Sequence, residues 1–256
     1  PMIEGQETEL ATAVAQARKL PQSARLPLFH GLLGDLNDTR AALRLAEHFG
    51  GVVDHADGDA IAVNLGVYQD SGWIATSLGE VRNRADLVVF IGSGIDERLP
   101  RLRERLFDVE ERLHTQTSAH VMTLGDDART ILDQVRTLLH GRPLQSPSST
   151  ALDLHERLQQ SAYPVLVPFV ADDPEAELII RAAADIIRQI NETNRAALLM
   201  LTAGIGAATA QHASTWHGGF GIRTSFAARY PEQDLLRHAG QRLLGAHEAD
   251  LLVWIS

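Results

Sequence analysis

Short apolar runs alternate along the chain with segments whose apolar residues have helical spacing. Seven such runs predict β-strands at residues 26–33, 51–54, 86–91, 119–124, 164–170, 196–201 and 249–255. Several of them are continuous rather than alternating, which is typical of parallel strands buried on both faces. Helical spacing predicts helices at residues 38–49, 129–139 and 174–190. Strands that alternate with helices predict an α/β fold with doubly wound sheets.

One segment, residues 141–150, is rich in proline, serine and glycine and predicts a linker. It would separate a first α/β lobe at residues 1–140 from a second lobe at residues 151–256. The first lobe would contain a long polar loop at residues 54–85, which leads into an apolar strand. Long loops next to buried strands often carry sites in α/β proteins, so this loop is the first place to look for function.

The two predicted lobes share a local pattern. Residues 83–91 read NRADLVVFI, and residues 247–255 read HEADLLVWI. This similarity favours two related, Rossmann-like lobes, although Ala-Asp before an apolar strand is also a common local pattern. The chain starts at Pro1 and ends at Ser256, directly after a predicted strand, so we expect it to be incomplete at both ends.

Composition and charge reduce the number of functional classes that fit the chain. Of the 256 residues, 45% are apolar and 22% are charged, as in ordinary globular proteins. The formal net charge of −10 argues against nucleic acid and against anionic membrane surfaces, because both attract basic proteins. Cysteine is absent, which excludes disulfides, cysteine-bound zinc, cysteine-bound iron–sulfur clusters and a thiol nucleophile on this chain. Since no secretory signal is visible, we expect a cytoplasmic protein.

Two short motifs could bind ligands, but each has a simpler explanation. Asp54, His55, Asp57 and Asp59 form an oxygen-rich cluster whose order does not fit a calcium loop, so a surface turn is favoured over a metal site. The Gly204–Gly206 turn follows a predicted strand, as in dinucleotide-binding proteins. Thr209 occupies its third fingerprint position, and a tight packing turn is therefore favoured. For Gly92-Ser93-Gly94, a packing turn is favoured even more strongly over a ligand-binding turn.

Other polar residues are weaker candidates. His212 and His217 flank Trp216 in a glycine-rich stretch and could bind a metal or a substrate, but ordinary loop or interface histidines are favoured. Three isolated residues stand near predicted strand ends, where ligands of doubly wound sheets bind: His30, Arg223 and Arg229. Four arginines interleaved with glutamates predict a solvated helix face with ion pairs: Arg98, Arg101, Arg103 and Arg105.

Three stretches carry a resemblance to a known family. They are residues 43–54 (LRLAEHFGGVVD), residues 69–92 (QDSGWIATSLGEVRNRADLVVFIG) and residues 215–231 (TWHGGFGIRTSFAARYP). In this order they resemble the B subunit of formylmethanofuran dehydrogenase, which belongs to the molybdopterin oxidoreductases. The resemblance covers most of the chain, and the run LGEVRNRAD is fairly specific. It implies a molybdopterin-oxidoreductase-like fold.

The resemblance also implies a cofactor that this sequence does not match. The family holds a tungsten or molybdenum bis-pterin and a [4Fe–4S] cluster, and cysteine or selenocysteine ligates the metal. That ligand position falls on Ala60, and Ile61 stands where the family tends to have histidine. Neither side chain has a ligating atom, and a soft metal without a thiolate or selenolate loses its main protein anchor. We therefore expect no metal, no cofactor and no catalytic residue on this chain.

One branch of the family fits this loss. In methylotrophic bacteria, related A, B, C and D subunits form a formyltransferase/hydrolase complex that converts formyl-tetrahydromethanopterin to formate during formaldehyde oxidation. The resemblance implies formyl transfer by the D subunit and hydrolysis by the amidohydrolase-like A subunit. The present chain would then be a noncatalytic structural subunit with A, C and D as partners. Two alternatives stay open: a redox-active B subunit of formylmethanofuran dehydrogenase, and a stand-alone nucleotide- or pterin-binding protein.

A structural subunit should hide apolar surface against its neighbours. Four aromatic residues lie in stretches that we expect to be loops: Trp73, Trp216, Phe220 and Tyr230. A free monomer would rarely expose four such side chains, so some of them are candidates for contacts with other subunits. The alternative is that they cover the core of this chain.

Overall fold

The chain forms two compact α/β units. The computed structural model describes residues 1–108, 111–114, 118–170, 173–202 and 204–256. Unit 1 combines residues 1–62 with residues 204–256, and unit 2 consists of residues 63–203. Every strand and helix expected from the sequence is present over at least part of its expected range, which confirms the α/β class.

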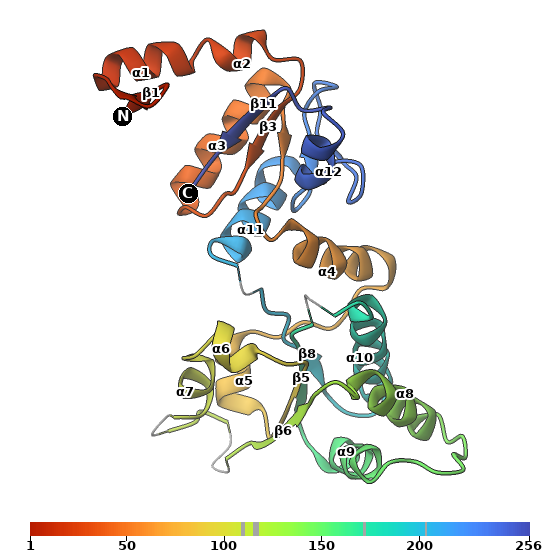
Figure 1. Ribbon diagram of the computed structural model, residues 1–256. Helices are drawn as coiled ribbons and strands as arrows, with labels where there is room; N and C mark the ends of the chain where they lie inside the picture. The colour runs from red at the N-terminus through yellow and green to blue at the C-terminus, as the bar shows by residue number, and fades with distance from the viewer. Residues whose placement is uncertain (109–110, 115–117, 171–172, 203) are drawn as a thin grey trace. The chain divides into compact units, whose positions relative to one another are not determined.

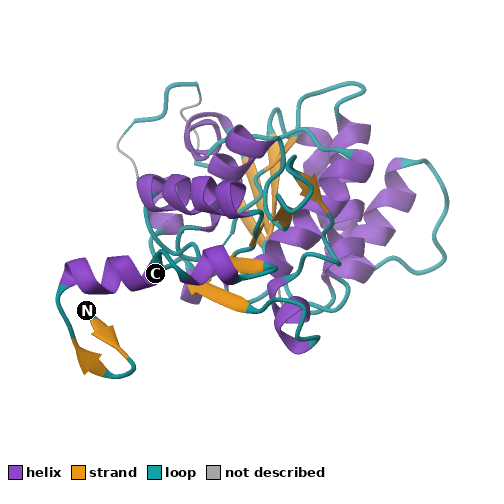
Figure 2. Ribbon diagram, turned by 90° about the horizontal axis from the view of Figure 1, so that it is seen from above, coloured by secondary structure: helices purple, strands orange, loops and turns teal. Residues whose placement is uncertain are grey.

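Unit 1 contains the two ends of the chain. Its elements are β1 (Met2–Ile3), β2 (Gln6–Glu7), α1 (Leu10–Ala17), α2 (Leu20–Ser23), β3 (Pro27–His30), α3 (Leu36–Phe49), β4 (Val52–Val53), the first turn of α4 (Gly58–Ser71), α11 (Ala207–Gly218), β9 (Thr224–Ser225), β10 (Glu232–Gln233), α12 (Gly240–Gly245) and β11 (Leu251–Trp254). Figure 2 shows the β1–β2 hairpin next to the N-terminus, followed by helix α1.

The sheet of unit 1 joins strands from both ends of the chain. Its strand order is β10-β9-β4-β3-β11, in which β4, β3 and β11 are parallel and β9 is antiparallel to β4 and to β10. Helices α3 and α11 pack together beside this sheet (Figure 1). Their small residues Ala42, Ala46 and Ala210 form a core with Phe29 and Phe226.

Helix α3 shows how local sequence sets the ends of an element. The Asp35 carboxylate accepts hydrogen bonds from the N–H groups of Asn37 and Asp38, and the Asp38 carboxylate accepts one from the Asp35 N–H. This reciprocal capping box satisfies donors at the helix start, so α3 begins two residues before the predicted start. Gly50 ends the helix in the left-handed conformation, with φ of 70°.

Unit 2 is a parallel sheet covered by helices on both faces. Its elements are the rest of α4, α5 (Leu78–Arg84), β5 (Leu87–Ile91), α6 (Ile95–Arg98), α7 (Leu102–Phe107), β6 (His120–Leu124), α8 (Ala128–Leu139), α9 (Ser149–Gln160), β7 (Pro164–Pro168), α10 (Ala176–Ile190) and β8 (Ala197–Leu198). The strand order is β6-β5-β7-β8. Helices α8, α9 and α10 lie on one side of the strands, and α5, α6 and α7 lie on the other (Figure 1).

Strand β5 is the centre of this arrangement. Leu87, Val89 and Ile91 pack toward the core formed with α8, α9 and α10, while Val88 and Phe90 pack toward α6 and α7. All five residues are buried, as expected for a parallel strand between two helical layers. The continuous apolar run in the sequence therefore has a direct structural cause.

The repeated Ala-Asp pattern has the same role in both units. The Asp86 carboxylate precedes β5 and accepts hydrogen bonds from the N–H groups of Ala162 and Tyr163, at 2.6 and 2.9 Å, ahead of β7. The Asp250 carboxylate precedes β11 and accepts hydrogen bonds from two consecutive backbone N–H groups ahead of β3, at 2.9 to 3.1 Å. Each aspartate thus fixes the start of the neighbouring parallel strand.

The division of the chain differs from the one expected. Residues 141–150 do not separate the two units, because they connect α8 to α9 inside unit 2. The boundaries fall near residues 62 and 204, since β11 pairs with β3 and α11 packs on α3. Contacts between the two ends of the chain cannot be recognised from any local sequence pattern. The proline-rich segment suggested a domain boundary, but it only connects two helices.

The expected loop at residues 54–85 is largely helical. It contains α4 and α5, joined by residues 72–77. Ile61, Leu65 and Val67 of α4 are buried, so this helix is anchored by packing although its asparagine and glycines favour loops. None of the helices in the described part of the chain is long and apolar enough to cross a membrane.

Candidate functional site

The polar residues of unit 1 gather at the carboxyl ends of β3 and β4. His30 is the last residue of β3, and Asp54 and His55 directly follow β4. Because β3 and β4 are parallel and adjacent, their carboxyl ends meet at one edge of the sheet, where doubly wound folds place their ligands. Asp54, His55 and His30 are all buried there, together with Arg223 and His238.

Asp54 is the centre of this cluster. Its Oδ1 accepts a hydrogen bond from the His55 N–H at 2.9 Å, and its Oδ2 accepts one from the Gly240 N–H at 2.8 Å. The Arg223 Nε lies 3.5 Å from Oδ1. Desolvation raises the pKa of the Asp54 carboxyl, against the opposing effects of the Gly240 N–H and the Arg223 charge. The carboxylate is therefore held inside the protein by backbone donors and one cation.

Arg223 connects this cluster to the surrounding segments. Its Nη1 donates to the Leu235 carbonyl at 2.5 Å, and its Nη2 donates to the Asp59 carboxylate. The side chain is only 6% exposed, and its backbone is left-handed with φ of 55°. Non-glycine residues rarely adopt this conformation, so the ion pairs hold a strained backbone in place.

His55 is neutral and fully engaged. Its Nδ1 accepts a hydrogen bond from the Asp57 N–H at 2.9 Å, and its Nε2 donates to the Ile205 carbonyl at 3.0 Å. This pattern requires the tautomer that carries its proton on Nε2. Burial lowers the pKa of the imidazole below its ordinary value of 6.5, which keeps it uncharged at neutral pH.

The oxygen-rich cluster was expected to be a surface turn, and that expectation is half wrong. Asp54 and His55 are buried, whereas Asp57 is half-buried and Asp59 is exposed. The buried pair is bonded to the Gly240 N–H and the Ile205 carbonyl, partners that lie far along the chain. In the described parts of the chain, no group of three or more histidine, cysteine, aspartate or glutamate side chains could hold a metal ion.

The Gly204–Gly206 turn packs against protein. Gly206 precedes α11 with φ of 72°, and a Cβ there would lie 2.7 Å from the Leu32 carbonyl oxygen. A Cβ on Gly204 would meet the Asp57 carboxylate. Gly206 is thus required by its backbone conformation and a close backbone contact, as the packing interpretation predicts, whereas at Gly204 the neighbour is the end of the Asp57 side chain.

Ala60 lies in the first turn of α4, two residues after the buried Gly58. Its half-buried side chain is a methyl group, and the next residue, Ile61, is completely buried. Neither side chain can ligate a metal. The donor set at this position therefore does not fit a tungsten or molybdenum centre, and we derive no redox step through such a group.

No protein-family model matches the chain. Over 99% of its length, the chain is 27% identical to the B subunit of the formyltransferase/hydrolase complex Fhc of Methylorubrum extorquens, of which it covers 74%. It also matches a chain in the crystal structure of the formyltransferase/hydrolase complex FhcABCD from Methylorubrum extorquens in complex with methylofuran, with a TM-score of 0.82 and 27% identity over 99% of this chain and 75% of that chain. Over nearly its whole length the chain is therefore similar to the B subunit of a formyltransferase/hydrolase complex.

Two further proteins match over a shorter region. They are the B subunits of tungsten-containing formylmethanofuran dehydrogenase 2 from Methanocaldococcus jannaschii and Methanococcus maripaludis, with 32% and 31% identity. Each match covers 39% of this chain and 23% of the relative. The similarity to the Fhc protein is lower in identity but extends over nearly the whole chain.

The histidines near Trp216 lie on helix α11 and not in a loop. His212 is exposed, and the His217 Nε2 lies 3.0 Å from the Glu47 carboxylate on α3. The glycines at 218 and 219 suggested a loop, but they only end the helix. No local pattern pointed to Glu47 as a partner, because the two residues lie on separate helices that pack side by side.

The three isolated polar residues, His30, Arg223 and Arg229, lie in different places. His30 and Arg223 both join the Asp54 cluster, since the His30 Nδ1 lies 3.2 Å from the Asp54 carbonyl oxygen. Arg229 is exposed and stays apart. His238, which the sequence did not suggest, is buried with its Nδ1 3.3 Å from the Arg223 carbonyl oxygen.

The expected arginine-rich face is confirmed in part, because its ion pairs are present but the arginines are divided between α6, α7 and the connection between them. Arg101 pairs with Glu104 at 2.7 Å, and Arg103 pairs with Asp96 at 2.5 Å. The Arg103 guanidinium also lies 4.3 Å from the centre of the Phe90 ring. These residues stabilise the surface of α6 and α7 and have no catalytic arrangement.

The four candidate interface aromatics differ in exposure. Trp73 is half-buried against the core of unit 2, so it covers that core. Phe220 is half-buried in unit 1. Trp216 and Tyr230 are 93% and 63% exposed. Trp216 lies on helix α11 and not in a loop, and it is the most exposed of the four.

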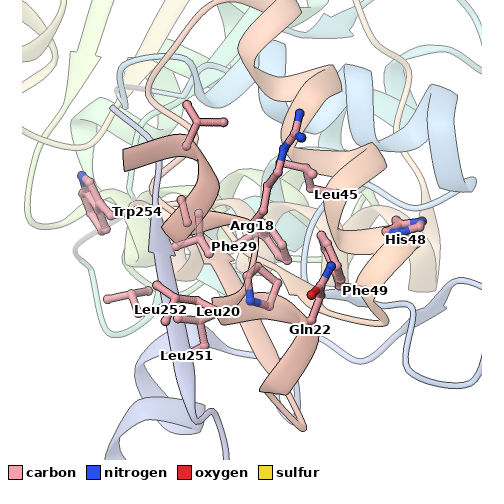
Figure 3. A pocket seen from close by; sticks show the side chains of 14 residues that line it. Arg18, Leu20, Gln22, Phe29, Leu45, His48, Phe49, Leu251, Leu252 and Trp254 are labelled. Carbon is pink, nitrogen blue, oxygen red and sulfur yellow. The ribbon is translucent and has the colours of Figure 1, made fainter. Parts of the chain in front are cut away.

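A groove of about 720 Å³ lies elsewhere in unit 1, between α1, α2, α3 and β11 (Figure 3). Its walls include Leu20, Phe29, Phe49, Leu252 and Trp254. Arg18, Gln22 and His48 add polar groups, and no carboxylate lines it. The groove offers apolar surface without an acid–base pair, and it does not include Asp54 or Ala60.

Proposed function

We propose that the chain is a noncatalytic structural subunit of a formyltransferase/hydrolase complex. The decisive observation is the position of Ala60. The resemblance implies that the metal ligand of formylmethanofuran dehydrogenase falls at this position, and the chain offers a methyl group there, beside the buried Ile61. The nearby polar groups of Asp54, His55 and Arg223 are engaged with one another or with backbone atoms, so they hold the fold and leave no reacting group.

The similarity to the Fhc protein supports the proposal that this chain is a subunit of such a complex. In the proposed complex, the partners are an amidohydrolase-like A subunit, a C subunit and a formyltransferase-like D subunit. The complex would convert formyl-tetrahydromethanopterin to formate, with formyl transfer on D and hydrolysis on A. The present chain would supply shape and contacts to those partners.

The same proposal extends to the architecture. We propose that both units derive from Rossmann-like lobes of a molybdopterin-oxidoreductase-type protein that has lost its cofactor. The parallel strand pairs in both sheets and the shared use of Asp86 and Asp250 support this origin. According to this proposal, the sheet edge that carries Asp54 is a structural remnant of the ancestral cofactor-binding protein.

Metal and pterin analysis of the intact assembly tests the proposal. We expect far less than one molybdenum or tungsten atom and less than one pterin per copy of this chain, after purification from the native host. A tungsten-containing formylmethanofuran dehydrogenase, purified in parallel, is the positive control. Stoichiometric metal and pterin would overturn the proposal.

An Ala60→Ser variant tests the same point within the chain. Ala60 is half-buried, and in the proposed function no reacting group depends on it. We therefore expect formyl transfer and formate release by the assembled complex to stay within about 2-fold of the unchanged complex, since surface and half-exposed changes are usually small. A loss above 10-fold with normal assembly would assign a catalytic role to this site.

The redox-active alternative rests on the tungsten-containing relatives. It predicts electron transfer from formate to a viologen dye by the purified assembly.

The stand-alone alternative rests on the Gly204–Gly206 turn, and it predicts that nucleotides or pterins raise the melting temperature of the isolated chain. The close packing of Gly206 against the Leu32 carbonyl gives this glycine a structural role and so removes the main reason for the stand-alone alternative.

A further inference from the structure

Helices α3 and α11 form a surface hollow that the proposed function does not explain. It has a volume of about 410 Å³. We call it the arginine–tryptophan patch, and its residues are Leu36, Arg40, Arg44, Ala213, Trp216 and His217. The patch lies entirely within unit 1, and Asp54 is not among its residues.

Trp216 dominates the patch. It lies in the last turn of α11, and 93% of its surface is exposed. Leu36, at the start of α3, is 50% exposed. Single exposed apolar residues are common on monomers, but tryptophan is enriched at the centres of protein interfaces because it buries a large area.

Charge gives the patch a second unusual property. Arg40 and Arg44 stand four residues apart on α3, and neither forms an ion pair with a described residue. Other arginines of the chain have an acidic neighbour at this helical spacing, as in the Arg157–Asp153 pair at 2.9 Å. Like charges at this spacing destabilise a helix slightly, so a partner that supplies carboxylates would relieve the repulsion.

We infer that the arginine–tryptophan patch docks an acidic protein surface on another subunit of the complex. The Trp216 indole would enter an apolar pocket of the partner, and carboxylates beside that pocket would pair with Arg40 and Arg44. Arginine suits this role because its planar guanidinium binds carboxylates with two parallel hydrogen bonds. The inference rests on the proposed function, since it requires partner subunits.

Other occupants fit the patch less well. A second copy related by two-fold symmetry would bring the same surface against itself and place four arginines together. A small anion would pair with Arg40 and Arg44 but leave Trp216 and Leu36 in water. Nucleic acid is disfavoured by the net charge of −10. An acidic protein surface with an apolar pocket satisfies both halves of the patch.

The experiment compares variants in the assembled complex. The chain carries an affinity tag, is co-expressed with the other subunits, and its affinity for them is measured at low and high salt. Trp216→Ala should weaken assembly by about 10-fold or more, as for a hot-spot residue. The double variant Arg40→Glu/Arg44→Glu should weaken it as strongly at low salt and less at high salt, because screening reduces the repulsion.

Matched controls separate docking from general damage. Leu236→Ala removes an apolar side chain that is 80% exposed, and Arg142→Glu/Arg195→Glu reverses two exposed charges in unit 2. Both controls should assemble normally. Unchanged thermal unfolding of the isolated Trp216→Ala chain would show that the patch residues act in binding rather than in folding.

The outcomes distinguish the inference from the proposed function. If the unaltered chain does not assemble with the other subunits, the proposed function is wrong. If it assembles and both patch variants assemble equally well, the inference is wrong while the proposed function stands. If Trp216→Ala instead dissociates a dimer of the isolated chain, the partner is a second copy and the inference is also overturned.

Discussion

Asp54 and Arg223 stand on segments that are far apart in the sequence, yet they share one buried cluster at the end of β4. Asp54 binds two backbone N–H groups, and Arg223 reaches the Leu235 carbonyl and Asp59. In a catalytic site, groups of this kind point at a substrate. Here they join the β4–α4 turn to the segment around residues 222–240, so their role is to fix backbone.

The first prediction concerns the loss of this cation. Arg223→Met keeps most of the side-chain length but leaves the Asp54 carboxylate buried without its positive neighbour. We expect a loss of about 3–5 kcal/mol in the free energy of unfolding of unit 1, as for other broken buried pairs. Urea unfolding followed by circular dichroism measures it.

Arg229→Met is the matched control for this change. Arg229 is exposed, and its backbone is also left-handed, with φ of 68° against 55° for Arg223. The two substitutions therefore affect a similar backbone and differ in the ion pair. We expect a change of at most about 0.5 kcal/mol for the control, and equal losses for both variants would contradict the role given to the cluster.

The second prediction concerns pH and His55. The folded protein keeps this imidazole neutral, because burial lowers its pKa below the ordinary value of 6.5. The unfolded chain takes up a proton near pH 6.5, while the folded chain does so only at lower pH. Stability from this group is therefore present above pH 6.5 and is lost as pH falls toward the folded pKa.

Urea midpoints at about pH 7.5 and about pH 5.5 test this dependence. We expect a smaller difference between the two pH values for His55→Asn than for the unchanged chain, because asparagine does not titrate. The raised pKa of Asp54 has the opposite sign: it makes stability fall as pH rises from 3.8 to its folded pKa. An equal pH dependence in the variant and the unchanged chain would exclude His55 as its source.

At the scale of elements, continuous apolar runs identified the strands correctly. Strand β5 is buried on both faces, and no polar residue interrupts it. Helix α4 was missed, since its glycines and asparagine favour loops and only its buried positions Ile61, Leu65 and Val67 anchor it. A single sequence shows propensity and periodicity, but it does not show which segment another part of the chain will cover.

The same limit applies to the candidate site. His30 and Arg223 could be selected because they stand near strand ends. The importance of Asp54 could not, since its partners include the backbone N–H of Gly240, which has no side chain to signal it. The pairing of His217 with Glu47 was equally hidden, because it depends on how α3 packs against α11.

The third prediction compares the two glycines at the ends of α11. Gly206 and Gly219 both have positive φ, at 72° and 81°. A Cβ on Gly219 meets nothing within 4 Å, whereas a Cβ on Gly206 would lie 2.7 Å from the Leu32 carbonyl oxygen. Gly219→Ala should therefore cost about 1–2 kcal/mol from backbone strain alone.

Gly206→Ala should cost clearly more, because the same strain is joined by a steric clash with backbone. Urea unfolding of the two variants, measured side by side, provides the comparison. Similar losses would mean that the Gly206 turn can move away from Leu32, and the packing role of the turn would have to be given up.

At the scale of the whole molecule, the two units differ in how the chain builds them. Unit 2 is one continuous segment, while unit 1 needs both ends of the chain. The sequence predicts a division at residues 141–150, where the composition changes. Composition marks exposed connections, and it does not reveal that β11 returns to pair with β3.

The fourth prediction follows from this difference. A fragment of residues 58–203 keeps α4 intact and contains every strand of the β6-β5-β7-β8 sheet. We expect it to fold alone, with a cooperative thermal transition in circular dichroism. A fragment of residues 1–57 lacks α11, β9 and β11, and it should show no such transition. A fragment 58–203 that unfolds without cooperativity would contradict the division into units.

The late arrival of β11 has a consequence for synthesis. Its partner β3 leaves the ribosome about 220 residues earlier, which at about 5–20 residues per second corresponds to roughly 10–45 s. During that time β3 has an unpaired edge, while the whole of unit 2 can be completed and fold. The growing chain can therefore complete unit 2 before unit 1, and the edge of β3 that pairs with β11 stays open until β11 has been made.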